Sequence, residues 1–105
     1  MSEEYQTEIT EETIVKDTET PDLPKRYKVI IHNDDYTPME FVVEVLMEIF
    51  KMGEITATQI MWNIHHQGKG ICGVYSYEIA ETKVVRVHEL AAQFEYPLRA
   101  SMEVE

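Results

Sequence analysis

The chain has 105 residues, a net charge of −11 and 44% hydrophobic residues, which is enough for one domain with one small core. No segment approaches the ~18 consecutive apolar residues of a membrane span, and the first residues lack the basic and apolar regions of a secretory signal. The single cysteine, Cys72, excludes an internal disulfide and favours a reducing, cytoplasmic location.

The acidic charge is concentrated at the N-terminus. Residues 1–24 contain eight acids and one lysine and have few core-forming side chains, so we expect a disordered acidic extension there. Composition leaves open whether this arm is only solvated or engages a partner. Residues 25–105 are the predicted core domain. Since nucleic acids and anionic membranes are bound through clustered basic side chains, neither is an expected partner.

The first predicted strand covers residues 26–33, RYKVIIHN, because it contains three successive β-branched residues. The turn-forming sequence Asn-Asp-Asp at residues 33–35 ends it. A capping box then predicts a helix start, with Thr37 at the N-cap, Pro38 at the first helical position and Glu40 two residues later.

Two helices are predicted in succession. The first ends at Gly53, and a second capping box, formed by Thr56 and Gln59, begins a helix that Gly68 ends. Each has apolar residues at three- and four-residue spacing, which indicates one buried face. These positions are Met39, Val42, Val43, Leu46, Ile49 and Phe50 in the first helix, and Ala57, Ile60, Met61 and Ile64 in the second.

The rest of the chain predicts a strand, a helix and a strand. Residues 70–79 alternate in the manner of a central strand, with Cys72 buried on one face. Residues 80–95 have helical spacing, Pro97 ends that helix, and residues 98–104 form a closing strand. The order β-α-α-β-α-β predicts a small α+β domain with a three-stranded antiparallel sheet packed with three helices.

Few residues could carry chemistry. The sequence has no G-x-S-x-G, no glycine-rich phosphate loop and no His-Glu-x-x-His motif, and a buried Cys72 is a poor nucleophile, so we expect no enzyme. Asp35, His65 and His66 have the side-chain types of zinc ligands. Adjacent helical histidines point about 100° apart, so such a site needs a fortunate geometry. A metal-binding regulatory domain is nevertheless one alternative.

A pocket for a cation is the better hypothesis. Asn33 offers a carbonyl oxygen, Asp35 a negative charge and neutral His65 a lone pair, and three acceptors match the three donors of a primary ammonium group. Apolar walls would come from residues 37–39 and from residues 61–64 beside them. A peptide α-amino group followed by a hydrophobic side chain fits both halves. Otherwise His65 is simply a histidine stabilised in the last turn by the helix dipole.

The strongest motifs are Y-K-V-I-I-H-N-D-D-Y-T-P-M-E-F-V at 27–42, H-H-Q-G-K-G-I-C-G-V-Y at 65–75 and E-I-A-E-T-K-V at 78–84. Together they resemble the Clp protease adaptor family, ClpS, from Arg26 to about Glu103. The resemblance implies an adaptor, with no cofactor, that binds proteins with N-terminal Leu, Phe, Tyr or Trp. It would deliver them to a Clp AAA+ unfoldase for degradation, with the help of a flexible arm.

The same resemblance implies roles for individual residues. Asn33, Asp35 and His65 would hold the α-amino group, and Met39 would reject β-branched first residues. Glu78 and Lys83 would contact the N-terminal domain of the unfoldase. The side-chain pocket would be formed by Ile31, Thr37, Met39, Val42, Met61, Ile64 and Leu98.

Three residues near these positions receive smaller roles or none. We expect Asp34 to cap or orient the loop, and His32 and His66 receive no role. A further alternative is a domain that modulates the unfoldase without binding N-terminal residues.

Overall fold

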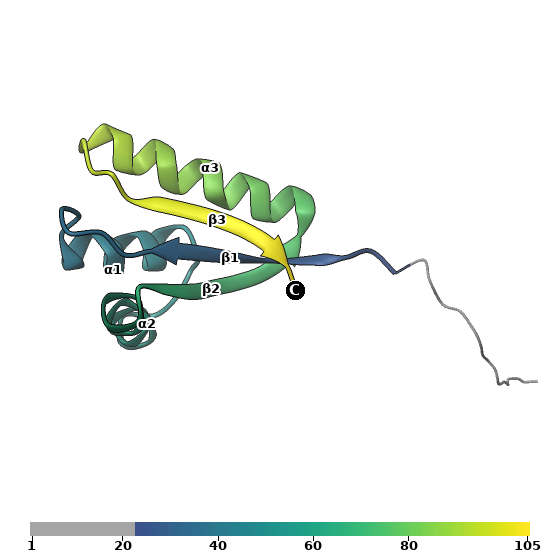
Figure 1. Ribbon diagram of the computed structural model, residues 1–105, viewed down its shortest axis with the longest axis horizontal. Coiled ribbons are helices and arrows are strands. Elements are labelled where there is room, and N and C mark those ends of the chain that lie inside the picture. The colour runs from purple at the N-terminus through teal and green to yellow at the C-terminus, as the bar shows by residue number, and fades with distance from the viewer. Residues whose placement is uncertain (1–22) are drawn as a thin grey trace, which may run out of the picture.

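The computed structural model describes residues 23–105 and has the predicted element order β-α-α-β-α-β (Figure 1). The expected arm at residues 1–24 lies outside the described residues except for its last two positions. The elements are β1 (Arg26–His32), α1 (Met39–Glu48), α2 (Glu54–Gln67), β2 (Lys69–Ser76), α3 (Tyr77–Gln93) and β3 (Arg99–Val104).

The three strands form one antiparallel sheet in the order β2-β1-β3, which confirms the predicted fold class. β1 is the central strand, so the strand around Cys72, expected to be central, lies at an edge. Val29 pairs with Gly73 and Ile30 with Ile71, which leaves Cys72 as the extra residue of a bulge. Cys72 is buried as expected, and this burial raises the pKa of its thiol to about 12, so the reactive thiolate is disfavoured.

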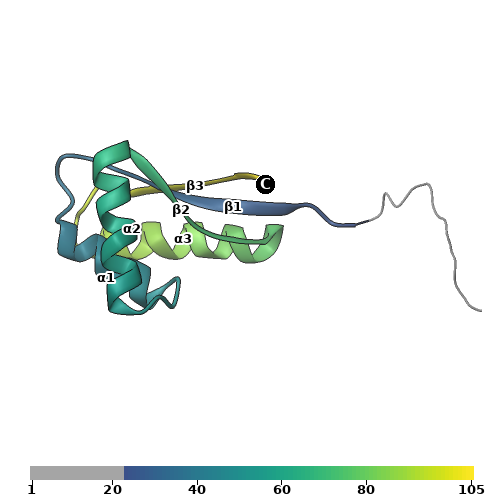
Figure 2. The same ribbon diagram turned by 90° about the horizontal axis from the view of Figure 1, so that it is seen from below.

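The core lies between the sheet and the helices. α1 and α3 cover one face of the sheet, and α2 packs against α1 and β2 (Figure 2). None of the helices within residues 23–105 is long and apolar enough to cross a membrane. The largest fully buried side chains come from β1, from the three helices and from the residue that follows α1: Val29, Ile31, Val45, Leu46, Ile49, Ile64 and Val87.

The loop between β1 and α1 is organised by Asp34. Its Oδ1 accepts hydrogen bonds from the backbone amides of Tyr36 (2.8 Å) and Thr37 (2.7 Å), and its Oδ2 accepts one from the Thr37 hydroxyl (2.8 Å). The Thr37 hydroxyl is directed at Asp34 and accepts no hydrogen bond from the amides of α1, so the predicted capping box is wrong. The N-cap residue is Pro38, without a side-chain cap, and the helix begins at Met39. The expectation that Asp34 orients the loop matches these contacts.

The connection between α1 and α2 also differs from the prediction. α1 already ends at Glu48, and the two residues that follow it, Ile49 and Phe50, are buried in the core. Gly53 does not end α1; it is the N-cap residue of α2. The second capping box is therefore wrong as well, since Thr56 lies inside the first turn of α2.

α3 begins at Tyr77, within the stretch that the alternating pattern assigned to a strand. Ser76 pairs with Arg26, the first residue of β1, so the following residues have no neighbouring strand to pair with. At the other end of α3, the His88 side chain contacts the sheet. Its Nε2 accepts a hydrogen bond of 3.0 Å from the backbone amide of Ala100 on β3.

The close approach of β2 to α2 predicts that Gly70→Ala destabilises the fold. A Cβ atom at this position would lie 2.8 Å from Cγ1 of Ile64, whose side chain is fully buried and cannot move freely. We expect a loss of about 1–3 kcal/mol in the free energy of unfolding, measured by urea denaturation. Gly53→Ala is the control, because nothing lies within 4 Å of a Cβ there. Equal stability of the two variants would contradict the contact.

The loop contacts predict unequal effects of the two adjacent acids on stability. Asp34→Ala removes three hydrogen bonds and should lower the free energy of unfolding by about 1–2 kcal/mol. Asp35→Ala should leave it nearly unchanged, because no hydrogen bond among residues 23–105 involves the exposed Asp35 side chain. Urea denaturation of both variants measures the difference, and a larger loss for Asp35→Ala would refute the assignment.

Candidate functional site

The site begins with the end of α2. Gly68 has the left-handed conformation (φ 92°) that lets a helix end sharply, and its amide donates to the carbonyl of Ile64 at 2.9 Å. This confirms the predicted helix end. The Gly68 carbonyl in turn accepts a hydrogen bond of 2.9 Å from the amide of Asn33, the residue after β1. Asn33 and the last turn of α2, which carries His65, are thereby held next to each other.

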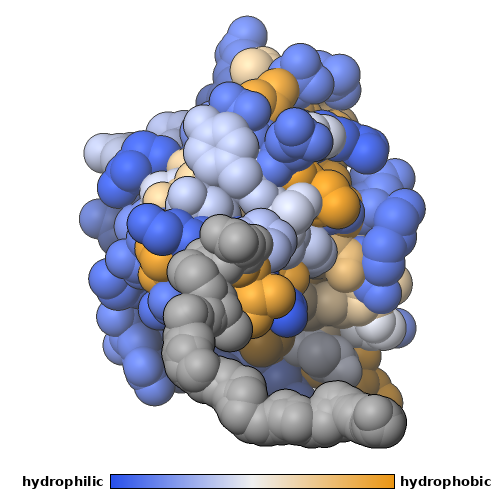
Figure 3. Space-filling model, turned by 90° about the vertical axis from the view of Figure 1, so that its right-hand side faces the viewer, coloured by the Kyte–Doolittle hydropathy of each residue, from blue (hydrophilic) through white to orange (hydrophobic). Residues whose placement is uncertain are grey.

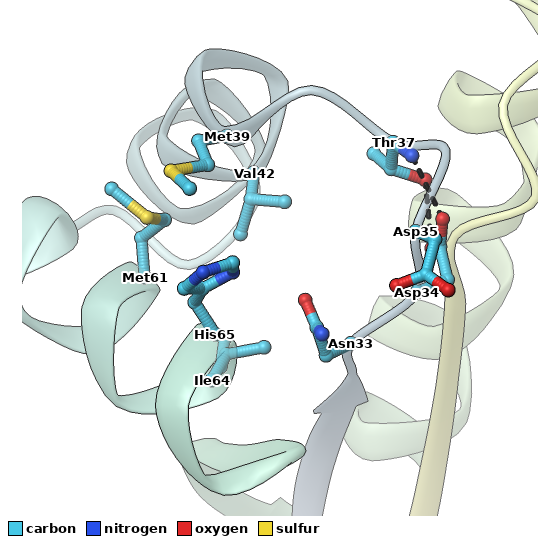
Figure 4. Close-up of a pocket in the computed structure, with 9 residues that line it drawn as sticks. All are labelled: Asn33, Asp34, Asp35, Thr37, Met39, Val42, Met61, Ile64 and His65. Carbon is cyan, nitrogen blue, oxygen red and sulfur yellow. Dashed lines mark hydrogen bonds between the residues drawn. The ribbon is translucent and has the colours of Figure 1, made fainter.

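A cavity of about 190 Å³ lies between the β1–α1 loop, the start of α1 and the last turns of α2 (Figure 4). It combines polar side chains from the loop and from His65 with apolar side chains from both helices. Its lining consists of Asn33, Asp34, Asp35, Thr37, Met39, Val42, Met61, Ile64 and His65.

The polar half contains all three residues expected to hold an α-amino group. Asn33 and His65 face each other across the cavity, and Asp35 lies on the loop opposite the two methionines (Figure 4). Both oxygens of Asp34 accept hydrogen bonds within the loop, whereas Asp35 and His65 accept none from the described residues. The cavity therefore offers a negatively charged carboxylate and an imidazole, each with acceptor capacity for a donor-rich cation.

The apolar half contains five of the seven residues expected to form a side-chain pocket. Val42, Met61 and Ile64 are buried, whereas Met39 is 37% exposed at the start of α1 and lies near Met61 (Figure 4). These side chains and Thr37 form a wall suited to a hydrophobic group. The other two expected residues, Ile31 and Leu98, belong to the buried core and do not line the cavity.

The alternative of a metal site receives no support from the geometry. Within residues 23–105, no three His, Cys, Asp or Glu side chains lie together in a group that could hold a metal ion. The set required by that alternative, Asp35 with His65 and His66, is therefore not assembled.

The two residues expected to contact the unfoldase lie on α3, away from the cavity. Lys83 is half-buried; its Nζ donates to the carbonyl of Ile49 at 2.7 Å and lies 5.5 Å from the ring centroid of Tyr75. Burial, with the nearby positive charges of Lys51 and Arg86, lowers the pKa of Lys83. Lys83 thus satisfies a carbonyl at the end of α1 and has a structural role within the fold.

Glu78, in contrast, is exposed in the first turn of α3. It borders a shallow groove of about 430 Å³ at the end of the sheet where β1 begins, lined also by Pro24, Lys25, Tyr27, Ser76 and Tyr77. Figure 3 views this end of the molecule, where hydrophobic residues lie among hydrophilic ones. Tyrosine is among the residues enriched in protein–protein interfaces, and two tyrosines line this groove.

The sequence reasoning missed one group beside the site. The ring centroid of Trp62 lies 5.8 Å from that of His65 and 5.5 Å from that of His66. Trp62 precedes these histidines by three and four residues, and helical residues at that spacing are neighbours, so the contact could have been predicted.

Comparison with known proteins gives a consistent result. The family model described as ATP-dependent Clp protease adaptor protein ClpS matches residues 22–101. A protein of Shewanella piezotolerans named ATP-dependent Clp protease adapter protein ClpS is 50% identical over 103 residues, which is 98% of each chain. A protein of Syntrophus aciditrophicus with the same name is 55% identical over 80 residues, covering 76% of this chain and 75% of the relative.

A solved structure matches as well. The structure of Agrobacterium tumefaciens ClpS2 bound to L-phenylalaninamide has a TM-score of 0.77 and 41% identity, and the match covers 79% of this chain and all of that one. Sequence and fold therefore agree: the chain belongs to the ClpS family of adaptor proteins of the ATP-dependent Clp protease, which are adaptors and not enzymes.

Proposed function

We propose that this adaptor binds the free N-terminus of proteins that begin with Leu, Phe, Tyr or Trp and delivers them to a cytoplasmic Clp AAA+ unfoldase. The observation that carries the proposal is that one cavity has Asn33, Asp35 and His65 on one side and buried apolar side chains on the other. The related protein of Agrobacterium tumefaciens binds L-phenylalaninamide, which joins a free α-amino group to an aromatic side chain.

Both halves of the cavity are needed for selectivity. A peptide α-amino group ordinarily titrates at pH ~7.7–8.0, so it is mostly cationic at neutral pH, and each charge-assisted hydrogen bond contributes ~1.5–3 kcal/mol. Burial of a Leu or Phe side chain contributes about 1.5–3 kcal/mol. Micromolar affinity requires about 8 kcal/mol. Side-chain burial alone falls far short of this, and three charge-assisted bonds reach it only at the top of their range, before the cost of association is subtracted. Internal residues of the same type, which lack the amino group, are therefore not bound.

Two alternatives are weaker. A metal-binding regulatory domain lacks an assembled ligand set within residues 23–105. A modulator of the unfoldase that ignores N-terminal residues would have no use for a cavity with unsatisfied acceptors beside an apolar wall.

The proposal predicts that a peptide with N-terminal Phe binds and that its N-acetylated form does not, because acetylation removes the charge and two donors. Fluorescence anisotropy titrations measure both affinities. Asp35→Ala and His65→Ala should each weaken binding of the free peptide at least about tenfold, the loss of one charge-assisted bond. Glu48→Ala, which removes an exposed acid at the far end of α1, is the control. Equal binding of free and acetylated peptides would sink the proposal.

The position of Met39 predicts its role in selectivity. Met39→Ala should admit peptides with N-terminal Ile or Val, because it removes a side chain at the cavity wall that a β-branched residue would meet close to its backbone. Met47→Ala is a matched control, since Met47 is similarly exposed (39%) on the same helix but does not line the cavity. Anisotropy with Phe-, Ile- and Val-first peptides measures the selectivity; an unchanged preference in Met39→Ala would rule out the gate.

Docking on the unfoldase is proposed to use Glu78 and Lys83. Glu78→Ala should weaken binding of the isolated unfoldase N-terminal domain several-fold in calorimetric titration without changing peptide affinity, because Glu78 is exposed and far from the cavity. Glu89→Ala on the same helix is the control. Lys83→Ala is less direct, since loss of its bond to Ile49 should also lower stability by about 1 kcal/mol. Unchanged docking of Glu78→Ala would contradict this interface.

A further inference from the structure

His65 has an orientation that its hydrogen bonds do not explain. Its side chain is exposed, and no hydrogen bond within residues 23–105 involves its imidazole. A free imidazole at the last turn of a helix would occupy several rotamers, and ordering it on ligand binding would cost affinity. The ring nevertheless faces Asn33 across the cavity (Figure 4).

The contacts that fix His65 come from an aromatic cluster, which we define as Trp62, His65 and His66. The Trp62 ring lies edge-to-face with the His65 ring, at 5.8 Å between centroids and 82° between planes. The His66 ring lies parallel to the Trp62 ring at 5.5 Å and 18°, and it meets the His65 ring at 5.3 Å and 70°. Offset parallel and edge-to-face arrangements at these distances are the preferred geometries of aromatic pairs.

We propose that Trp62, held by its stacking on His66, is a positioning residue that orients the His65 imidazole toward the substrate's α-amino group. Trp62 does not line the cavity, so it acts through His65. This inference rests on the proposed function, which assigns His65 to the amino group. An aromatic contact of this kind changes an equilibrium by a factor of about two to ten, which sets the expected loss of affinity.

The competing explanation is that Trp62, which is 43% exposed, touches the second or third residue of a bound protein directly. Two ligands separate these explanations. L-phenylalaninamide has an α-amino group and an aromatic side chain but no second residue. A Phe-first decapeptide has the same two groups and further residues after them. A positioning role affects the two ligands equally, and a direct contact affects only the peptide.

The experiment is calorimetric titration of both ligands into wild type, Trp62→Ala, Trp62→Phe and Ile55→Ala. We expect Trp62→Ala to weaken both ligands about three- to tenfold, and Trp62→Phe, which keeps an aromatic ring, to stay within about twofold of wild type. Ile55 is 77% exposed on the same helix, seven residues before Trp62, so Ile55→Ala controls for loss of an apolar surface group and should bind normally. Thermal denaturation checks that each variant is folded.

Several results overturn the inference. These are wild-type affinity of Trp62→Ala for L-phenylalaninamide, a loss confined to the decapeptide, or an equal loss in Trp62→Phe and Trp62→Ala. If Trp62→Ala does not fold, His66→Ala is the deciding variant, because it removes the stacking partner of Trp62. It should lower the affinity for both ligands about twofold. An unchanged affinity refutes the positioning role.

A double variant distinguishes failure of this inference from failure of the proposed function. If His65→Ala binds both ligands as tightly as wild type, the proposed function itself is refuted. If His65→Ala binds weakly, adding Trp62→Ala should cause no further loss, since Trp62 acts only through the missing imidazole. A further loss of threefold or more in Trp62→Ala/His65→Ala overturns the positioning role and leaves the proposed function intact.

Discussion

The hydrogen bond from the Asn33 amide to the Gly68 carbonyl joins the end of the central strand to the end of α2. It forms because Gly68 adopts a left-handed conformation that non-glycine residues reach only with strain, so the helix stops one turn after Ile64 and the chain reverses at once into β2. Everything at the site depends on this junction. It sets the separation between the loop acids and the last turn of the helix, and hence the width of the cavity.

The two adjacent acids of the loop illustrate how a rigid site is built from a short sequence. The Asp34 carboxylate accepts hydrogen bonds from two backbone amides and from the Thr37 hydroxyl, and these bonds hold the loop in one conformation. Asp35 lies on the loop backbone that Asp34 holds in place, and its charge is not neutralised by a partner among the described residues. The His65 side is arranged differently, because aromatic packing by Trp62 and His66 replaces hydrogen bonds.

Hydrophobic periodicity was sufficient to predict the number, type and order of the elements, because a stripe such as Val42, Leu46 and Ile49 has one way to be buried. Local signals were less reliable at the boundaries. The Thr37 capping box was wrong because the Thr37 hydroxyl turns toward Asp34 in the loop and not toward the helix. The predicted strand after Ser76 was wrong because β1 offers no further partner. The cavity residues were identified through motifs, but Ile31 and Leu98 lie behind its walls in the core. Trp62 was missed because its role depends on ring orientations, which spacing alone does not specify.

The contact between His88 and Ala100 has a consequence for the behaviour of the protein in concentrated solution. β3 is an edge strand, and an edge strand with free amide groups can pair with the strand of another molecule. The imidazole of His88 accepts a hydrogen bond from one of these amides, at Ala100, and thereby removes a free donor near the start of the edge strand. The same histidine that ties α3 to the sheet therefore also protects this part of the edge strand from pairing with another molecule.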